Sequence, residues 1–266
     1  MKKILKEIIK RLIPQILMSQ PGVLKRDQKR ISEVKDKFKG QRCFILGNGP
    51  SLNEIDLGLL KDEYSFAVNS IFYKTREIGY KPNFFAVEDN HIINDNLQEL
   101  IDYDCEYMFF PSKYKNKIGK RLNRYFANLD YSFYISSNRF FEKSRFSKDC
   151  SKQIYCGQTV TMINFQLAYY MGFTEVYLIG MDFNYEVPKS AVVEGNQITS
   201  TEADLNHFHP DYFGKGKKWN DPKLDLVLQS YKLAKVEFEK GGRKIINATK
   251  GGKLELFERT DYNSLF

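Results

Sequence analysis

One short apolar run followed by a glycine loop constrains this chain more than any other feature. Residues 42–52 read RCFILGNGPSL, and the run 43–46 has the composition of a buried parallel strand. Gly47, Asn48 and Gly49 then supply the residue types of a sharp turn. The sequence therefore predicts a strand of an α/β sheet that ends in a tight loop.

The residues after this loop predict the start of a helix. Ser51 can cap that helix, and Glu54, three positions later, completes a capping box. A strand, a tight turn and a helix N-terminus direct backbone N–H groups at one point, where a nucleotide phosphate can bind. The loop lacks the third glycine of a dinucleotide fingerprint and the lysine of a P-loop, so a turn without a ligand is the alternative.

The composition favours one large α/β domain with anionic partners. The chain has 266 residues, of which 42% are hydrophobic, and this is enough material for one core. The formal charge of +8 favours nucleotides, acidic lipid surfaces or nucleic acid. The four cysteines form no Cys-x-x-Cys pair, so we expect reduced thiols in a cytosolic protein and no zinc site.

Residues 1–39 are predicted to form a basic amphipathic helix and a linker. Apolar residues repeat at helical spacing in residues 1–18, lysine and arginine lie between them, and Pro14 is expected to kink or end the helix. Such a helix can lie in a membrane interface, or pack on its own domain or on a partner subunit of a homo-oligomer. No secretory signal and no run of roughly 18 apolar residues is present. We expect a cytoplasmic protein that can contact the inner face of the membrane.

Further apolar runs alternate with helical patterns from residue 40 onward. The runs cover residues 64–68, 82–87, 105–110, 176–179 and 244–249. The helical patterns cover residues 157–172, which start with threonines that include Thr159, and residues 222–240. This alternation predicts a single α/β, Rossmann-like domain over residues 40–266, with a mostly parallel sheet and helices on both faces.

Polar residues and a glycine follow the ends of three of these runs. They are Asn69, Ser70, Glu88, Asp89, Gly180 and Asp182. Because ligands of open α/β sheets bind beyond the carboxyl ends of the strands, we expect these residues around one crevice. Asn69 can bond a base or ribose, or cap a helix. Glu88 or Asp89 can hold a ribose hydroxyl or a metal, or stay solvated. Asp182 can take a sugar hydroxyl, or hold its loop together.

Residues 184–222 show little periodicity and are predicted to form a lid. His207 and His209 lie there, together with the only tryptophan. A histidine on a lid over a nucleotide crevice is typical of a general base, and structural histidines that pin the lid are the alternative. Two histidines alone are weak evidence for a metal, so no metal site is predicted.

The chain resembles two related groups of enzymes. Residues 45–56 (ILGNGPSLNEID), 68–73 (VNSIFY) and 171–183 (MGFTEVYLIGMDF) are similar to the CMP-sialic-acid-dependent bacterial sialyltransferases of glycosyltransferase family forty-two. The second group is the MptE-like family, which includes 6-hydroxymethylpterin diphosphokinases and Maf-type transferases. The segments 157–161 (GQTVT), 207–213 (HFHPDYF) and 246–252 (INATKGG) resemble it. The resemblance spans about residues 40 to 260.

The resemblance implies roles for particular residues. Asn48, Asn69, Gly180 and Asp182 would contact the cytidine nucleotide, and Tyr185 could reach its phosphate. The base that deprotonates the acceptor would be His209, His207 or Asp211, in that order, and Glu88 stands where that family has a crevice asparagine. With the loop and strand ends, the expected nucleotide-binding set is Gly47, Asn48, Gly49, Ser51, Asn69, Ser70, Glu88, Thr159, Gly180, Asp182 and Tyr185.

The function that the resemblance implies is glycosyl transfer. An inverting enzyme would move an acidic sugar, of the sialic acid, nonulosonate or Kdo type, from a CMP-activated donor to a glycan or glycolipid acceptor in surface polysaccharide synthesis. No metal or other cofactor is required for that reaction. The alternative is an ATP- and Mg²⁺-dependent 6-hydroxymethylpterin diphosphokinase, in which Glu88, Asp89 and Asp182 would hold the metal. A third hypothesis, nucleic-acid binding by the basic stretch 113–124, is less favoured than a solvated face.

Overall fold

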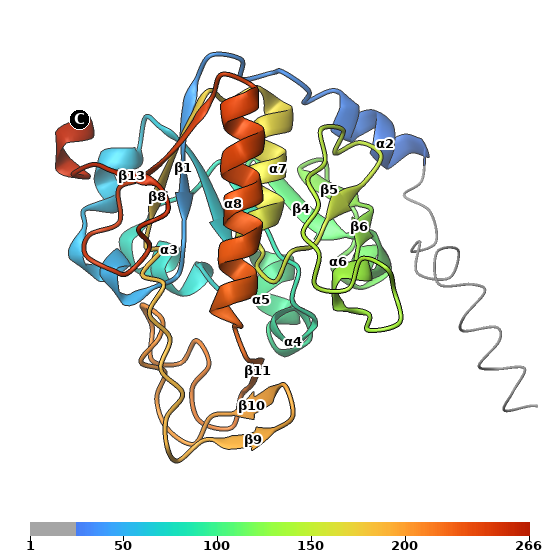
Figure 1. Ribbon diagram of the computed structural model, residues 1–266. Coiled ribbons are helices and arrows are strands. Elements are labelled where there is room, and N and C mark those ends of the chain that lie inside the picture. Colours follow the sequence, from blue (N-terminus) through green and yellow to red (C-terminus); the bar gives the residue numbers. More distant parts are fainter. Residues whose placement is uncertain (1–24) are drawn as a thin grey trace, which may run out of the picture.

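The protein is built around one eight-stranded parallel sheet. A computed structural model describes residues 25–266, so the expected helix over residues 1–18 lies outside the described residues. The strand order is β13-β12-β8-β1-β2-β3-β4-β5, and every pairing in it is parallel (Figure 1). The strands are β1 (Arg42–Leu46), β2 (Tyr64–Val68), β3 (Phe84–Ala86), β4 (Tyr107–Pro111), β5 (Arg124–Ala127), β8 (Glu175–Ile179), β12 (Lys244–Asn247) and β13 (Glu258–Arg259). This arrangement confirms the predicted α/β, Rossmann-like fold.

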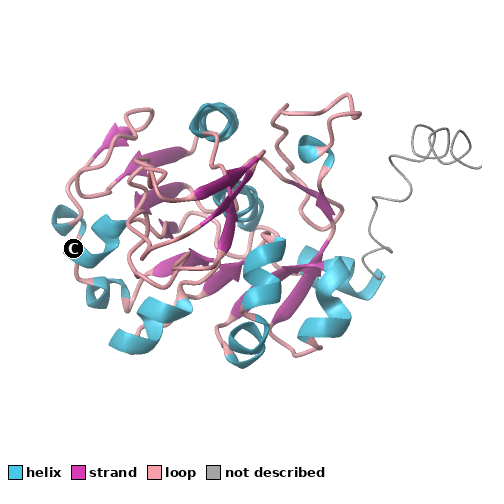
Figure 2. Ribbon diagram, turned by 90° about the horizontal axis from the view of Figure 1, so that it is seen from below, coloured by secondary structure: helices cyan, strands magenta, loops and turns pink. Residues whose placement is uncertain are grey.

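Helices cover both faces of the sheet, as the turned view shows (Figure 2). They are α2 (Lys25–Ser32), α3 (Phe72–Ile78), α4 (Asn90–Asp95), α5 (Leu97–Asp102), α6 (Lys115–Ile118), α7 (Thr161–Met171) and α8 (Leu224–Lys240). Alternate residues of a strand point to opposite faces, so Cys43 and Ile45 of β1 join the core under α7 and α8. Phe44 and Leu46 join the second core, on the other face.

The order of the strands creates a switch point beside β1. The chain adds β2, β3, β4 and β5 on one side of β1, then returns to add β8 and β12 on the other. In doubly wound sheets the loops at such a point diverge and leave a crevice beyond the carboxyl ends of the strands. The predicted glycine loop follows β1, so it lies at this point.

One local prediction about this region is wrong. The residues after the loop form a short 3₁₀ helix (Pro50–Glu54) that Ser51 does not cap, so there is no capping box and no long helix N-terminus there. The segment 184–222 contains a small antiparallel sheet of β9 (Val192–Glu194), β10 (Gln197–Thr199) and β11 (Lys218–Asn220). This segment projects beyond the carboxyl ends of the central strands, where a lid was expected (Figure 1).

The basic stretch 113–124 is partly packed against the rest of the protein. The basic stretch 113–124 includes a short 3₁₀ helix (Ser112–Tyr114), α6 and the start of β5. Within it Lys115 pairs with Asp27 of α2, so the stretch is not a wholly solvated face.

All four cysteines are buried and free. None of the helices in residues 25–266 combines the length and apolar composition that crossing a bilayer requires.

Candidate functional site

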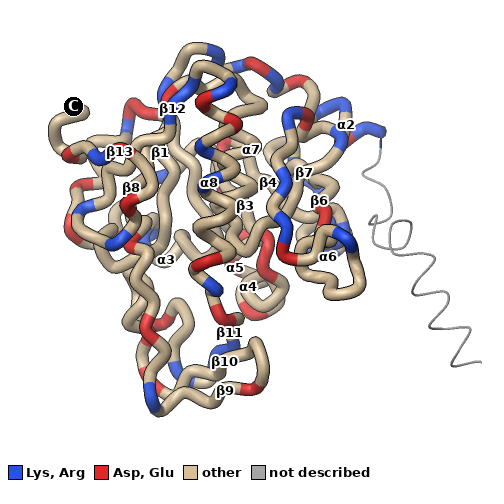
Figure 3. The backbone as a smooth tube through the Cα atoms, viewed as in Figure 1, with Lys and Arg blue, Asp and Glu red and all other residues tan. Residues whose placement is uncertain are grey.

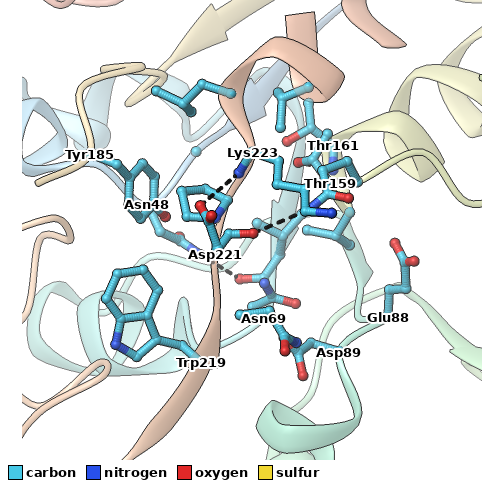
Figure 4. Close-up of a pocket in the computed structure, with 18 of the residues that line it drawn as sticks. Asn48, Asn69, Glu88, Asp89, Thr159, Thr161, Tyr185, Trp219, Asp221 and Lys223 are labelled. Atoms are coloured by element: carbon cyan, nitrogen blue, oxygen red, sulfur yellow. Dashed lines mark hydrogen bonds between the residues drawn. The ribbon is translucent and has the colours of Figure 1, made fainter. Parts of the chain in front are cut away.

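A cavity of about 1060 Å³ lies at the carboxyl ends of the central strands. Gly47 and Asn48 reach it from the end of β1, Asn69 from β2, Glu88 from β3 and Gly180 from β8. Figure 4 shows the labelled side chains of Asn48, Asn69 and Glu88 in this order across the site. The volume is in the range of cavities that bury a small organic ligand.

Two helices and the lid complete the walls. The start of α7 contributes Thr159 and Thr161, and the start of α8 contributes Lys223. Tyr185 and Trp219 come from the lid segment (Figure 4). Helix N-termini carry a partial positive charge, so the starts of α7 and α8 bring positive charge to the cavity wall.

Most of the residues predicted to bind a nucleotide line this cavity. Those that do are Gly47, Asn48, Gly49, Asn69, Glu88, Thr159, Gly180, Asp182 and Tyr185. Ser51 and Ser70 are buried and do not line it. The strand-end residues converge because parallel strands deliver their carboxyl ends to one edge of the sheet.

The predicted phosphate cradle at residues 47–51 is wrong, because the protein's own groups fill it. The N–H groups of Gly47 and Gly49 donate to the carbonyl oxygens of Ile179 (2.7 Å) and Gly180 (3.0 Å). Asp182 accepts from the Ser51 N–H (3.1 Å) and from the Ser51 hydroxyl (2.7 Å). Asp182 therefore holds the loop together, which was the alternative interpretation of this residue.

Of the three candidate bases, His207 lines the cavity. Its Nδ1 lies 2.7 Å from Asp204 Oδ2, and its Nε2 lies 2.7 Å from the Tyr185 hydroxyl. The imidazole also stacks on the Tyr212 ring, with 3.9 Å between the centroids. Since ionised Asp204 only accepts hydrogen bonds, Nδ1 carries the proton and Nε2 accepts from Tyr185.

The charge states along this chain of hydrogen bonds are consistent with that assignment. Burial opposes ionisation of Asp204, but the hydrogen bonds from His207 and from the backbone of Asn206 and Phe213 outweigh it, and its pKa is lowered. Burial raises the pKa of Tyr185, which keeps its hydroxyl protonated. Asp204, His207 and Tyr185 thus form an ordered path for a proton that ends at the cavity.

His209 and Asp211 lie on another side of the lid. The His209 ring stacks on Tyr73, with centroids 4.7 Å apart, and its Nε2 is 3.9 Å from Glu77 of α3. Its Nδ1 accepts from the Asp211 N–H. Neither residue lines the cavity, so the preferred order of bases changes in favour of His207.

Glu88 is the most deeply buried acid of the cavity. It is 6% exposed, and its Oε1 accepts from the Tyr134 hydroxyl at 2.7 Å. Its Oε2 has no hydrogen-bond partner among the described residues. Burial raises the pKa of Glu88, and nearby Asp89 adds to this, whereas Tyr134, the Cys156 thiol and Lys113 oppose it. The solvated loop acid considered from the sequence is therefore excluded for Glu88.

Several lining residues were not predicted from the sequence. They are His91, Lys113, Tyr131, Phe133, Tyr134, Gln158, Trp219 and Lys223. Four of them come from residues 112–141, where the sequence shows no clear period, so no pattern could have placed them. Lys223 follows the proline that begins the pattern 222–240, and its position at the start of that helix was the one available signal.

The positive charge of the chain is not concentrated in the cavity. Figure 3 shows lysines and arginines spread over many elements, and of these residue types Lys113 and Lys223 line the cavity. Lys223 pairs with Glu142 at 3.0 Å, and burial lowers the pKa of Lys113. Acidic residues outnumber them in the lining: Glu88, Asp89, Glu142, Asp182 and Asp221.

Unusual backbone conformations gather around the same cavity. In residues 25–266, six residues other than glycine have positive φ: Asp36, Asn69, Glu142, Gln158, Phe183 and Lys223. All except Asp36 line the cavity. Such conformations cost energy and persist where the surrounding structure enforces them, commonly at ligand sites. Their distribution is an independent sign that this cavity is a functional site.

The acidic residues do not gather into a magnesium site. Within the described part of the chain, no three His, Cys, Asp or Glu side chains come together as metal ligands. Asp182, one of the three acids that the diphosphokinase hypothesis requires, is bonded to Ser51. Glu88, Asp89 and Asp182 therefore do not fit the Mg²⁺ set expected from the sequence.

The fold and the cavity define a Rossmann-like α/β protein with a ligand site at the switch point of its sheet. Within this class the chain belongs to the MptE-like family, because the family model described as 6-hydroxymethylpterin diphosphokinase MptE-like matches residues 17–188. The fold is similar to the structure of the MAf glycosyltransferase from Magnetospirillum magneticum AMB-1, with a TM-score of 0.51 and 16% identity. That match covers 99% of this chain and 42% of the glycosyltransferase. No curated protein matches the sequence.

Proposed function

We propose that the protein is a glycosyltransferase that uses a nucleotide-activated sugar. The observation that carries the proposal is the Asp204–His207–Tyr185 path, which ends at a cavity formed by the strand ends. This combination supplies a place for a nucleotide and a base for an acceptor hydroxyl. The resemblance to the sialyltransferases and the Maf-like fold favour a CMP-activated acidic sugar as the donor, and a glycan or glycolipid as the acceptor.

The proton of the acceptor would leave through Tyr185. The Tyr185 hydroxyl is hydrogen-bonded to His207 Nε2, so His207 cannot reach the acceptor directly. Tyr185 would transfer its own proton to His207 and take the proton of the acceptor hydroxyl in the same step. The acceptor oxygen forms a bond to the anomeric carbon while the bond from that carbon to the phosphate oxygen breaks. Asp204 stabilises the imidazolium that results, as the carboxylate does in other Asp–His pairs.

The nucleotide phosphate would depart toward positive groups of the cavity. The N-termini of α7 and α8 open on it, and Lys113 and Lys223 are its lysines. These helix N-termini and lysines would stabilise the charge that develops on the leaving group.

The test combines binding with turnover. CMP, CDP, UDP, GDP and ATP are screened by thermal shift, with and without Mg²⁺, because stabilisation follows ligand affinity. We expect CMP to raise the melting temperature without Mg²⁺, and CMP-sialic acid or CMP-Kdo to be hydrolysed or transferred. If CMP leaves the melting temperature unchanged and neither donor is consumed, the proposal fails.

The second candidate is a pterin diphosphokinase, as the description of the family model suggests. The observation that favours it is Glu88, because a buried carboxylate with a free oxygen can accept from the amino and ring N–H groups of a pterin. Asp182, one of the three acids assigned to Mg²⁺ in this hypothesis, is bonded to Ser51 instead, and this counts against it. A preference for ATP over CMP that requires Mg²⁺, in the same screen, would decide for this candidate.

A further inference from the structure

The carboxylate of Glu88 is held in one position with one oxygen left over. The Tyr134 hydroxyl donates to Oε1, and the side chain is 6% exposed. Oε2 is buried, has no hydrogen-bond partner among the described residues, and belongs to a residue of the cavity lining. A buried acceptor without a partner costs roughly 1–3 kcal/mol, and more if it is charged, so its retention requires an explanation.

Two neighbouring strand ends present further unused acceptors. Asn48 turns its Nδ2 to the Val68 carbonyl and the Tyr212 hydroxyl, and this leaves its Oδ1 buried without a partner. Asn69 Oδ1 is likewise buried and without a partner. Since β1, β2 and β3 are adjacent in the sheet, the three side chains form a row of oxygen acceptors, as Figure 4 shows. A ligand placed against this row must supply hydrogen-bond donors.

Burial raises the pKa of Glu88, but most of the groups around it favour an ionised carboxylate that accepts hydrogen bonds. Tyr134 donates to it, Lys113 is the nearby cation, and the Cys156 thiol lies beside it. Asp89, the next residue, is the one like charge that opposes ionisation. A ligand carboxylate or phosphate would add a second like charge at a buried position, whereas an uncharged N–H or O–H group would pair the free oxygen.

We propose that Glu88 Oε2 is a specificity contact that binds an uncharged N–H or O–H group of the nucleotide sugar. The inference rests on the proposed function and deepens it, because it fixes which part of the donor lies against β3. For an acidic sugar, the carboxylate points away from Glu88, and either hydroxyl and amide groups of the sugar or the amino group of the base point toward it. Glu88 thereby selects for hydrogen-bond donors at this position.

The experiment measures binding of CMP and CMP-sialic acid to the wild type and to Glu88→Gln by titration calorimetry. The substituted amide is nearly isosteric, but it places an N–H donor or a neutral oxygen where Oε2 stands. We expect binding of the matched ligand to weaken roughly 10- to 100-fold, the range for one buried charge-assisted hydrogen bond. Glu33→Gln, the same exchange at an exposed residue of the segment after α2, is the control and should bind like the wild type.

The two ligands separate the two sources of the donor group. If Glu88→Gln weakens CMP as strongly as CMP-sialic acid, the base or ribose meets Glu88; if it weakens the sugar nucleotide alone, the sugar does. Both outcomes support the proposal. Equal or tighter binding of both ligands by Glu88→Gln would overturn it while leaving the proposed function intact. A wild type that binds neither ligand would overturn the proposed function, and the inference with it.

A pH series keeps the test independent of the folding of the variant. Protonation of Glu88 removes the acceptor, so we expect wild-type affinity for CMP-sialic acid, which has no phosphate group that titrates near neutrality, to fall on acidification. Of the titratable groups around Glu88, namely Asp89, Lys113, Tyr134 and Cys156, Asp89 is the other carboxylate. Asp89→Asn should retain the fall. Affinity that is constant or rises between pH 8 and pH 5 would contradict the proposal.

Discussion

At the scale of single residues, His207 and His209 have different surroundings although they lie two positions apart. His207 connects Asp204 to Tyr185 at the cavity, whereas His209 stacks on Tyr73 beside α3. We expect His207→Ala to lower kcat/KM for transfer by roughly 10²–10⁴, the usual contribution of a general base. His209→Ala should stay within a few-fold of the wild type.

The comparison of these two variants is its own control, because both remove one imidazole from the same segment. Tyr185→Phe should resemble His207→Ala if the proton passes through the tyrosine, with donor affinity largely retained. Should His209→Ala lose activity and His207→Ala keep it, the assignment of the base would be wrong. Steady-state kinetics with a fixed acceptor measures all three variants.

Glu88 should also make the stability of the protein depend on pH. Burial raises its pKa in the folded state above the ordinary value of 4.5, so the folded protein binds a proton that the unfolded chain releases. The stability from this group is present at acidic pH and is lost as pH rises through the folded pKa. Glu88→Gln, which never ionises, should therefore melt higher than the wild type at pH 8.

The expected rise is roughly 2–4 °C, the shift that one kcal/mol produces in a protein of this size. The difference between variant and wild type should shrink as the pH falls toward 4.5, because the unfolded glutamate then takes up a proton as well. Calorimetric melting curves from pH 4.5 to pH 8 measure it. A variant that is less stable at pH 8 would show that the carboxylate is stabilised by its neighbours more than burial penalises it.

The sequence identified the strand-end residues of the site but could not rank the bases or find the remaining wall. Asn48, Asn69, Glu88 and Gly180 follow apolar runs, and the end of such a run is visible in the sequence. Tyr134 and its neighbours lie in a segment without a period, whose path depends on contacts distant in sequence. Spacing alone cannot tell which of two histidines in an irregular lid faces inward.

At the scale of elements, the glycine loop after β1 allows close packing against the end of β8. A Cβ on Gly49 would lie 1.9 Å from Asp182 Oδ2, and one on Gly47 would lie 2.2 Å from the Gly180 carbonyl oxygen. The glycines are needed because this loop and the end of β8 approach so closely. The sequence pattern was detected correctly, but close backbone approach and phosphate binding require the same residue type.

Gly49→Ala should destabilise the protein by about 1–3 kcal/mol, the usual cost of overpacking. The new methyl group collides with Asp182, so Asp182→Ala in the same chain should recover part of that loss. Chemical denaturation of the two single variants and the double variant gives the coupling between the sites. Strictly additive effects would mean that the alanine is accommodated without displacing Asp182.

The lid shows why helix and strand patterns failed between residues 184 and 222. Its three strands are three residues each, too short for an alternating pattern to stand out. Its core is formed by aromatic residues that pack on one another, such as Phe213 on Trp219 with 6.0 Å between ring centroids. Contacts of this kind arise from the folded arrangement and leave no period in the sequence.

At the scale of the whole molecule, the parallel sheet was predictable and its electrostatics were not. Continuous apolar runs separated by helical patterns are what a sheet covered on both faces requires, and they gave the strands within a few residues. The charge of +8 suggested an anion site, but the basic residues are dispersed and the cavity lining holds more acids than lysines. Net charge therefore describes the surface of this protein better than its cavity.

The N-terminal residues allow a test of membrane contact. Residues 1–18 carry five lysines and arginines between their apolar positions, so we expect the full chain to sediment with vesicles that contain acidic lipid. A chain of residues 25–266 should stay in the supernatant while it binds CMP like the full chain. High salt should weaken the full chain's binding, because it screens the basic residues. Equal sedimentation of both chains would assign the contact to another surface.

Two hydrogen bonds connect Asn48, at the end of β1, to the lid residues Phe208 and Tyr212. The side-chain amide of Asn48 donates a hydrogen bond to the Tyr212 hydroxyl at 2.8 Å. The backbone carbonyl of Asn48 accepts one from the Phe208 N–H at 2.9 Å. Asn48, which is expected to contact the nucleotide, thus also holds residues 207–213 in place. A substrate that accepts a hydrogen bond from this amide must replace its bond to Tyr212, so donor binding is coupled to how residues 207–213 are held.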